Sequence, residues 1–329
     1  MSRTPKLFLA AVLPILSLSG FPQPSSSAPL RSILVNVLDR NGNAVRDLTK
    51  DSFHIKINKQ PVVVLGADYG LAPRRIVVLL DMSGSMGGQR DDNKWRIARE
   101  AVEDLIAQTP ADVPIALLTF SDQVHDVFDF RESRSAISRW FREGPTQRNS
   151  VKGRTALHDA ILASLRMLRP YLSGDALYVI TDGGDNASHV SFDRTRTALR
   201  ESRVRLYALL FPGFAPTTEE LGGADAVVEM AAETGGFVFG IPGRPALGSV
   251  SSLPGWDLNY DYNDRTRDKI KTYTQMLNTQ IHGFYTLQVG VPLQPGKSAK
   301  VSLEIVDAAG KTRRDIGYTF QRVISALDE

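Results

Sequence analysis

The residues that could do chemistry gather directly after two very apolar segments. The run RIVVLL at residues 75–80 is followed by DMSGS, which places one carboxylate and two hydroxyls within five positions. A second run, ALYVIT, is followed at once by another acidic residue in DGGD, and GRTAL between the two runs adds a further hydroxyl. The candidate site residues are therefore Asp81, Ser83, Ser85, Thr155 and Asp182.

Two carboxylates and three hydroxyls, with no nitrogen or sulfur, form a set of hard oxygen ligands. Such a set suits Mg²⁺, which takes six oxygens at about 2.0–2.1 Å and keeps water molecules where the protein supplies no ligand. Mn²⁺ or Ca²⁺ would accept the same donors. The two negative charges would balance those of the ion, so a carboxylate from a ligand could complete the shell. The set predicts a divalent-cation site that is open to an acidic ligand.

These residues need a scaffold that joins distant parts of the chain, and the apolar pattern predicts a parallel sheet. From residue 75 onward, apolar runs alternate with stretches of helical periodicity, including 93–108 and 267–281, which is typical of strands covered by helices on both faces. The carboxyl ends of such strands meet at one edge, where ligands bind. Asp81 and Asp182 are therefore expected at the same edge, beside a helix that begins at Thr155.

Both ends of the chain have a β pattern. ILVNVLD, SFHIKI and PVVVL lie near the start, and FYTLQVGV, AKVSLEIVD and RRDIGYTF lie near the end. Each group is too small for a stable sheet, and the termini of a domain often lie close together, so we expect the two groups to pair into one small β-sandwich. The predicted organisation is a leader over 1–28, a β segment over 29–72, an α/β domain over 73–282 with a long Gly/Pro-rich loop over 242–264, and a second β segment over 283–329.

The leader has the three parts of a secretory signal. A basic start precedes an apolar run from Leu7 to Leu18, and the segment ends in the small residues SSA. As a helix the run would span about 18 Å, which is short for a bilayer core of about 30 Å. We expect export to a secreted or periplasmic location; contact with a membrane would require that the leader stay uncleaved.

Composition narrows the classes of function further. The chain has no cysteine, which excludes disulfides, thiolate zinc sites and cysteine nucleophiles. The formal net charge is +3, and two of these charges, Arg3 and Lys6, lie in the leader. The remainder is close to neutral, so nucleic acid is not an expected partner.

The five candidate residues resemble a known metal site. DMSGS, the threonine of GRTAL and the aspartate of ITDGGD are similar to the metal-ion-dependent adhesion site of von Willebrand factor A (vWA) domains, and all five positions match. The resemblance covers about residues 73–281 and implies a doubly wound α/β fold with one antiparallel edge strand, VHDVFDF. It implies that Ser83, Ser85 and Thr155 hold Mg²⁺, or Mn²⁺ or Ca²⁺, with Asp81 and Asp182 ligating directly or through water.

The resemblance also implies a function. It indicates a non-enzymatic, adhesion-type module that binds an acidic group of a partner protein through the cation, and both β ends are similar to those of secreted bacterial vWA-related proteins. In vWA domains of the integrin type, completion of the metal shell moves the last helix, which implies a similar shift of residues 267–281 here.

Two other interpretations stay open. SGSMG resembles the nucleophile elbow of a serine hydrolase with Ser85 as nucleophile, although such an elbow normally has glycine where Ser83 stands. Asp182 and His189 would then have to act as acid and base from one loop, and Asp81 and Thr155 would have no role. The third interpretation is a purely structural domain that binds metal and recruits no partner. In all of these, Asp185 and Asn186 are assigned only to a turn.

Overall fold

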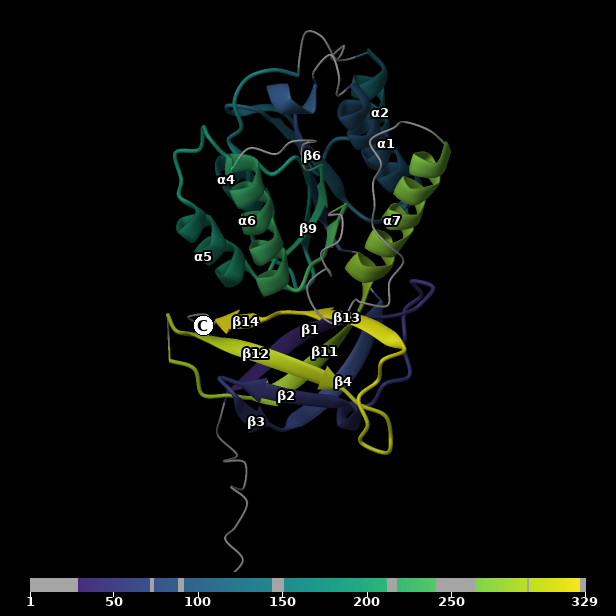
Figure 1. Ribbon diagram of the computed structural model, residues 1–329, viewed down its shortest axis with the longest axis vertical. Coiled ribbons are helices and arrows are strands. Elements are labelled where there is room, and N and C mark those ends of the chain that lie inside the picture. The colour runs from purple at the N-terminus through teal and green to yellow at the C-terminus, as the bar shows by residue number, and fades with distance from the viewer. Residues whose placement is uncertain are drawn as a thin grey trace, which may run out of the picture.

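The structure, a computed structural model, describes residues 29–71, 74–87, 92–143, 151–211, 218–240, 264–294 and 296–325. The predicted leader over 1–28 and nearly all of the predicted loop over 242–264 lie outside the described residues. An α/β part and a β-sandwich are stacked end to end (Figure 1).

A six-stranded sheet forms the centre of the α/β part, in the order β10-β9-β8-β5-β6-β7. Every neighbouring pair is parallel except β6 and β7, which are antiparallel. The four inner strands are buried along their whole length because helices cover both faces, which explains their continuous apolar runs. The predicted doubly wound fold is therefore confirmed, including the antiparallel edge strand from VHDVFDF. The strands are β5 (Ile76–Asp81), β6 (Ile115–Phe120), β7 (Val124–Phe128), β8 (Ala176–Thr181), β9 (Arg205–Leu210) and β10 (Val238–Phe239).

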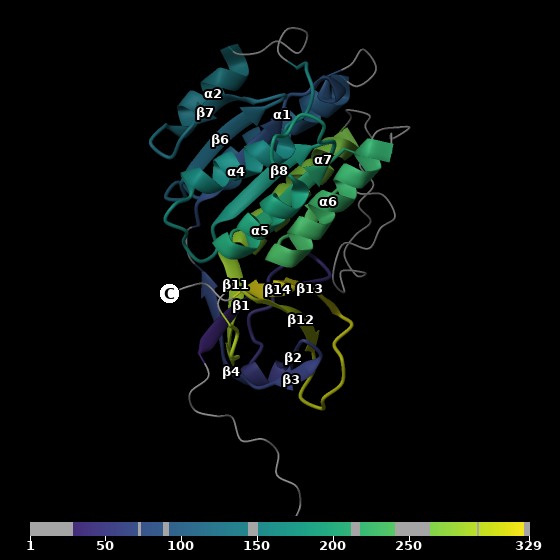
Figure 2. The same ribbon diagram turned by 90° about the vertical axis from the view of Figure 1, so that its left-hand side faces the viewer.

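Helices cover the sheet on both faces (Figures 1 and 2). Buried apolar residues of α1, α2 and α7 share one hydrophobic cluster with the sheet, and those of α4, α5 and α6 share another on the opposite face. None of the helices that the structure describes is both long and apolar enough to cross a membrane. The helices are α1 (Asp92–Gln108), α2 (Arg134–Glu143), α4 (Leu157–Met167), α5 (Phe192–Ser202), α6 (Thr218–Thr234) and α7 (Asp264–His282), with short 3₁₀ turns η1 (Lys50–Ser52) and η2 (Gly84–Met86).

The sandwich is built from both ends of the chain, as expected. One four-stranded sheet has the order β13-β1-β11-β4 and the other β14-β12-β2-β3, so N-terminal and C-terminal strands pair within each sheet. Their inner faces enclose a single apolar cluster. The strands are β1 (Leu30–Asp39), β2 (Phe53–Ile57), β3 (Gln60–Val62), β4 (Val64–Leu71), β11 (Gly283–Gly290), β12 (Ser298–Ile305), β13 (Ile316–Phe320) and β14 (Val323–Ser325).

A fully buried arginine lies at the junction of the two parts. The Nη1 of Arg205 donates to the carbonyl oxygen of Gln280 at 2.9 Å, and its Nη2 donates to those of Ile281 at 2.7 Å and Gly174 at 3.2 Å. Its guanidinium also stacks on the ring of Phe284, 4.3 Å from the centroid. A cation at the C-terminal end of α7 is favoured by the helix dipole as well as by these hydrogen bonds.

The same helix end is bonded to the sandwich. Asn36 of β1 donates from Nδ2 to the carbonyl oxygens of Gln280 at 2.7 Å and Gly283 at 2.9 Å, and its Oδ1 accepts from Arg205 at 3.1 Å. α7 continues without a break into β11, which pairs with both β1 and β4. A shift of α7 along its axis would have to break these bonds, and the shift implied by the resemblance stays a prediction.

We expect Arg205→Met to lower the free energy of unfolding by about 3 kcal/mol or more, because three buried carbonyl oxygens each lose the hydrogen bond from Arg205. Urea denaturation followed by circular dichroism measures the change. Arg166→Met, on the exposed side of α4, is the control and should stay within about 0.5 kcal/mol of wild type. Equal stabilities of the two variants would contradict this role of Arg205.

Candidate metal site

The five candidate residues lie at one end of the central sheet, Asp81 at the end of β5 and the other four in the three loops there. β5 and β8 are adjacent and parallel, with Leu80 opposite Ile180, so the residues that follow reach the same edge. Asp81 is the last residue of β5, and Asp182 directly follows β8. β5 follows β4 closely in the chain, so this edge faces away from the sandwich (Figure 1). The predicted meeting of the two carboxylates is therefore observed.

Asp81 is completely buried and its carboxylate is hydrogen-bonded on both oxygens. Oδ1 accepts from the backbone N–H of Ser83 at 2.8 Å, and Oδ2 accepts from the hydroxyl of Thr181 at 2.5 Å. Burial, and then the negative charge of Asp182, raise the pKa of Asp81 to about 7, although the hydrogen bonds act in the opposite direction. Two carboxylates this close to each other favour a cation beside them.

The two serines of the DMSGS loop face each other. Their hydroxyl oxygens are 3.1 Å apart, and Ser83 is buried while Ser85 is exposed. The backbone holds this loop against the next one, because Gly84 N–H donates to the carbonyl oxygen of Gly153 at 3.0 Å. The approach is tight at Gly87, where a Cβ would lie 2.7 Å from a methyl carbon of Val151. The loop that carries the two hydroxyls is therefore held in position by backbone contacts.

Thr155 is buried, and its position corrects one prediction. α4 begins at Leu157 with Ala156 as its N-cap, so Thr155 does not open the helix. Its backbone is used differently: its N–H donates to Asn186 Oδ1 at 2.9 Å, and its carbonyl oxygen accepts from the N–H groups of Asn186 and Ala187. Asn186 therefore ties the Thr155 loop to the loop that carries Asp182, a role beyond the turn to which the sequence assigns it.

Asp182 is buried beside Lys94, which is not one of the five residues predicted for the site. Its Oδ2 lies 3.4 Å from Nζ of Lys94, and the same ammonium donates to the carbonyl oxygen of Ser85 at 3.2 Å. The other oxygen, Oδ1, is buried without a hydrogen-bond partner among the described residues. The sequence does contain one indication that Lys94 is buried. It lies four residues before Ala98, and residues four apart share a face of a helix, which here is the apolar face of α1.

These residues fit a hard divalent cation. A buried carboxylate oxygen without a donor is costly unless something binds it, and Asp182 Oδ1 is such an atom. No cluster of three or more His, Cys, Asp or Glu with a metal-binding arrangement is found in the part of the chain that the structure describes. Hydroxyls and water would therefore complete the shell around Asp81 and Asp182, with Ser83, Ser85 and Thr155 as the hydroxyl donors.

The arrangement that a serine hydrolase would require is not assembled from the predicted residues. The hydroxyl of Ser85 pairs with that of Ser83. His189, the base of that interpretation, has its Nδ1 3.0 Å from Asp159 Oδ2, and its side chain is 90% exposed. The described contacts of Ser85 and His189 therefore give no support to Ser85 as a nucleophile.

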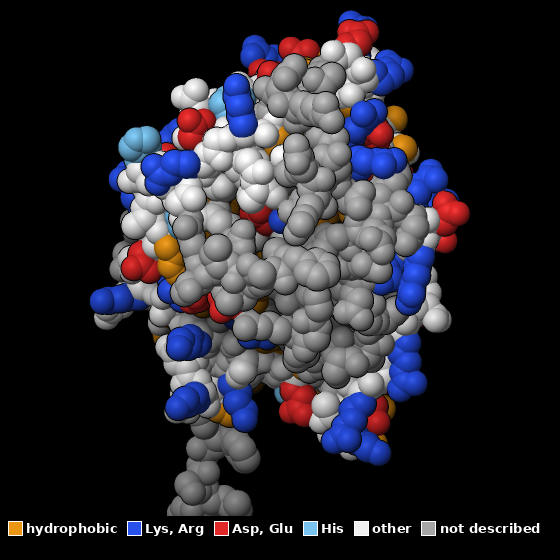
Figure 3. Space-filling model, turned by 45° about the horizontal axis from the view of Figure 1, so that its top comes forward, with side chains coloured by type: hydrophobic (Ala, Val, Ile, Leu, Met, Phe, Trp, Pro, Cys, Tyr) orange, Lys and Arg blue, Asp and Glu red, His pale blue; other side chains and the backbone are white. Residues whose placement is uncertain are grey.

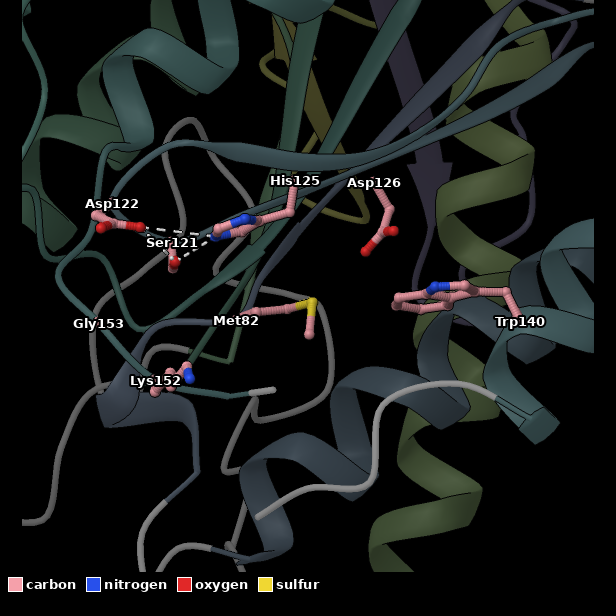
Figure 4. A pocket seen from close by; sticks show the side chains of 8 residues that line it. All are labelled: Met82, Ser121, Asp122, His125, Asp126, Trp140, Lys152 and Gly153. Atoms are coloured by element: carbon pink, nitrogen blue, oxygen red, sulfur yellow. Dashed lines mark hydrogen bonds and ion pairs between the residues drawn. The ribbon is translucent and has the colours of Figure 1, made fainter. Parts of the chain in front are cut away.

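A pocket of about 560 Å³ opens beside the site (Figure 4). Met82, the neighbour of Asp81, forms part of its wall, and Trp140 lies across from it. Ser121 Oγ is 2.6 Å from His125 Nε2 within this pocket. On the surrounding face, basic and acidic side chains are interspersed over the described surface (Figure 3). The lining residues are Met82, Ser121, Asp122, His125, Asp126, Trp140, Lys152 and Gly153.

Residues 76–185 match a family model described as von Willebrand factor type A domain. This segment, about a third of the chain, is similar to von Willebrand factor A domains. It runs from β5 into the loop after β8 and contains all five candidate ligands. No curated protein gives a significant sequence match to the chain.

Several solved structures are similar to this chain at low identity. A von Willebrand factor type A protein from Catenulispora acidiphila aligns with a TM-score of 0.46 at 12% identity, over 93% of this chain and 76% of its own. An aerotolerance-related membrane protein from Bacteroides fragilis aligns with a TM-score of 0.41 at 16% identity, over 63% of this chain and 98% of its own. BatB from Bacteroides thetaiotaomicron, a conserved hypothetical protein, aligns with a TM-score of 0.39 at 15% identity, over 62% of this chain and 98% of its own.

The raised pKa of Asp81 predicts a pH dependence of stability. Between the ordinary value of 3.8 and about pH 7, the folded protein holds a proton that the unfolded chain has lost. The stability that this proton contributes is present below about pH 4 and is lost as the pH rises through 7, by on the order of a few kcal/mol.

Melting temperatures in EDTA between about pH 5 and pH 8 test this pH dependence, with Asp81→Asn as the matched variant. An asparagine can accept from Ser83 and donate to Thr181 but does not titrate. We expect the wild type to lose more stability than Asp81→Asn over this range. The same loss in both proteins would show that Asp81 does not carry the effect.

Proposed function

We propose that this protein is an exported, non-enzymatic interaction module that binds an acidic group of a partner protein through a divalent cation. The observation that carries the proposal is the buried Asp182 Oδ1, which has no donor among the described residues. The charge of this carboxylate acts on Asp81, and Lys94 connects its other oxygen to the backbone of Ser85. Bound Mg²⁺, or Mn²⁺ or Ca²⁺, would supply a Lewis acid that accepts a carboxylate oxygen.

The residues of the vWA domain divide the work of holding the ion. Ser83, Ser85 and Thr155 would ligate it through their hydroxyls, and Asp81 and Asp182 directly or through water. Ser85 is exposed whereas the two carboxylates are buried, so access from solvent is on the side of Ser85. A ligand that approached there would meet the ion from outside.

The neighbouring pocket supports a protein as the ligand. Its wall continues from the metal loop through Met82 to Trp140, and Asp126 lies between them (Figure 4). A partner that placed an acidic side chain at the ion could place a flanking residue in this pocket. The basic start and apolar run of the leader support an exported location, secreted or periplasmic, where adhesion-type contacts are made.

We expect Asp81→Asn to abolish binding of Mn²⁺ in isothermal titration calorimetry while the protein stays folded, because the ion loses one of two anionic ligands. Asp122→Asn, which changes an exposed carboxylate on a neighbouring loop, is the control and should bind as wild type does. Unchanged affinity in Asp81→Asn would reject the site.

A pull-down from secreted or envelope fractions, in Mg²⁺ and again in EDTA, tests the partner. We expect the protein to capture a partner in Mg²⁺, and we expect this capture to be lost in EDTA and with the Asp81→Asn variant. Metal binding without any metal-dependent capture would instead support a structural metal site.

A fluorophosphonate probe separates the module from a hydrolase. Ser85 should stay unlabelled, because the hydroxyl of Ser83 is its hydrogen-bond partner and no base is positioned on it by the described residues. Mass spectrometry of the treated protein reports the outcome, and a modified Ser85 would favour the hydrolase.

A further inference from the structure

A lysine is buried inside the candidate metal site. Lys94 lies in the first turn of α1, and its residue is only 3% exposed. Lysine is almost never buried to this extent unless it is paired. Its ammonium contacts the carbonyl oxygen of Ser85 at 3.2 Å and Asp182 Oδ2 at 3.4 Å. A fixed positive charge therefore lies among the residues proposed to hold the ion.

The lysine and an ion would use different oxygens of the same carboxylate. Oδ2 of Asp182 faces Lys94, whereas Oδ1 has no partner within the described part of the chain. The ion can therefore bind without displacing the ammonium. Two cations on one buried carboxylate repel each other, and the repulsion is strong where water is excluded.

The effect of this repulsion follows from the net charge of the site. Asp81 and Asp182 alone would neutralise a divalent ion, and a further carboxylate would leave the loaded site negative. With Lys94 included, the loaded site carries one positive charge, and a carboxylate from a ligand brings it to neutrality. A buried net charge is unfavourable, so the neutral state with ligand is the preferred one.

We propose that Lys94 is an internal counter-cation that weakens binding of the divalent ion by itself and makes tight binding depend on an anionic ligand. This inference rests on the proposed metal site and adds the residue that couples the metal to the carboxylate. Without metal, the same ammonium stabilises the buried charge of Asp182.

A structural role and a counter-cation role predict opposite changes in metal affinity. If Lys94 only held Asp182 in position, its removal would loosen a ligand and weaken the binding of metal. If it acts as a competing charge, its removal strengthens the binding of metal, although the metal-free protein becomes less stable. The sign of the change in metal affinity therefore distinguishes the two roles of Lys94.

The test is isothermal titration of the purified protein with Mn²⁺, in wild type, Lys94→Met and Lys94→Arg. Methionine has a similar shape without the charge, and arginine keeps the charge. We expect Lys94→Met to bind Mn²⁺ about tenfold more tightly, with Lys94→Arg close to wild type. Lys271→Met, an exposed lysine on α7, is the control for a general loss of charge.

A second measurement adds acetate as the probe of the anion site, with chloride at the same ionic strength as the reference. Acetate should increase the apparent Mn²⁺ affinity of wild type and should have a much smaller effect on Lys94→Met. If Lys94→Met does not fold, Lys94→Gln replaces it in both measurements, because glutamine is neutral and keeps a donor for the carbonyl oxygen of Ser85.

The outcomes separate this inference from the proposed metal site. Loss of Mn²⁺ binding in Asp81→Asn, together with weaker or unchanged binding in Lys94→Met, would keep the site and overturn the role of Lys94. An equal effect of acetate on both proteins would also overturn it. If neither wild type nor any Lys94 variant binds Mn²⁺, both proposals fail; binding that is detectable only in the neutral Lys94 variants supports both.

Discussion

Two carboxylates are buried at the ends of adjacent parallel strands, and the candidate site depends on that placement. β5 and β8 pair in register, so Asp81 and Asp182 come close enough for the charge of one to raise the pKa of the other. Burial disfavours both charges. The groups around them reduce this cost, because Thr181 and Ser83 donate to Asp81 and Lys94 faces Asp182. A divalent ion on the remaining oxygen would reduce it further.

The loops that carry the hydroxyls are connected to one another mainly through the backbone. Lys152 N–H donates to the carbonyl oxygen of Met82, Gly84 N–H to that of Gly153, and Thr155 N–H to the side chain of Asn186. These bonds join the loops after β5, before α4 and after β8 into one unit. Side chains that are held in this way would need little ordering if an ion bound there, which favours a defined geometry over an adaptable one.

The opposite end of the α/β part is joined to the sandwich by a different kind of contact. The guanidinium of Arg205 and the amide of Asn36 converge on the last carbonyl groups of α7, in a buried region where each lost hydrogen bond is costly. α7 thus has one end fixed to both parts, and it passes directly into β11. A signal carried along this helix from the edge with the candidate metal site would have to act on the bonds at this junction.

Local patterns in the sequence determined much of the fold and of the oxygen set. Continuous apolar runs predict buried parallel strands, and the spacing of Asp81, Ser83 and Ser85 predicts a loop of oxygen donors, because both depend only on neighbours in the chain. The pairing of the two β ends followed from their small size. The sequence predicts that α4 begins at Thr155, whereas the helix begins at Leu157. Thr155 is instead bonded to Asn186, which is distant in sequence.

Only the tertiary structure showed which cation faces the buried acid. Lys94 and Arg96 lie on the same helix, and the first is buried while the second is exposed. The helical period places Lys94 on the apolar face, but its partner Asp182 is 88 positions away. Which carboxylate a buried ammonium neutralises depends on how α1 packs against the sheet. No local pattern encodes that contact, because its energy comes from desolvation and from charges that meet only in the folded chain.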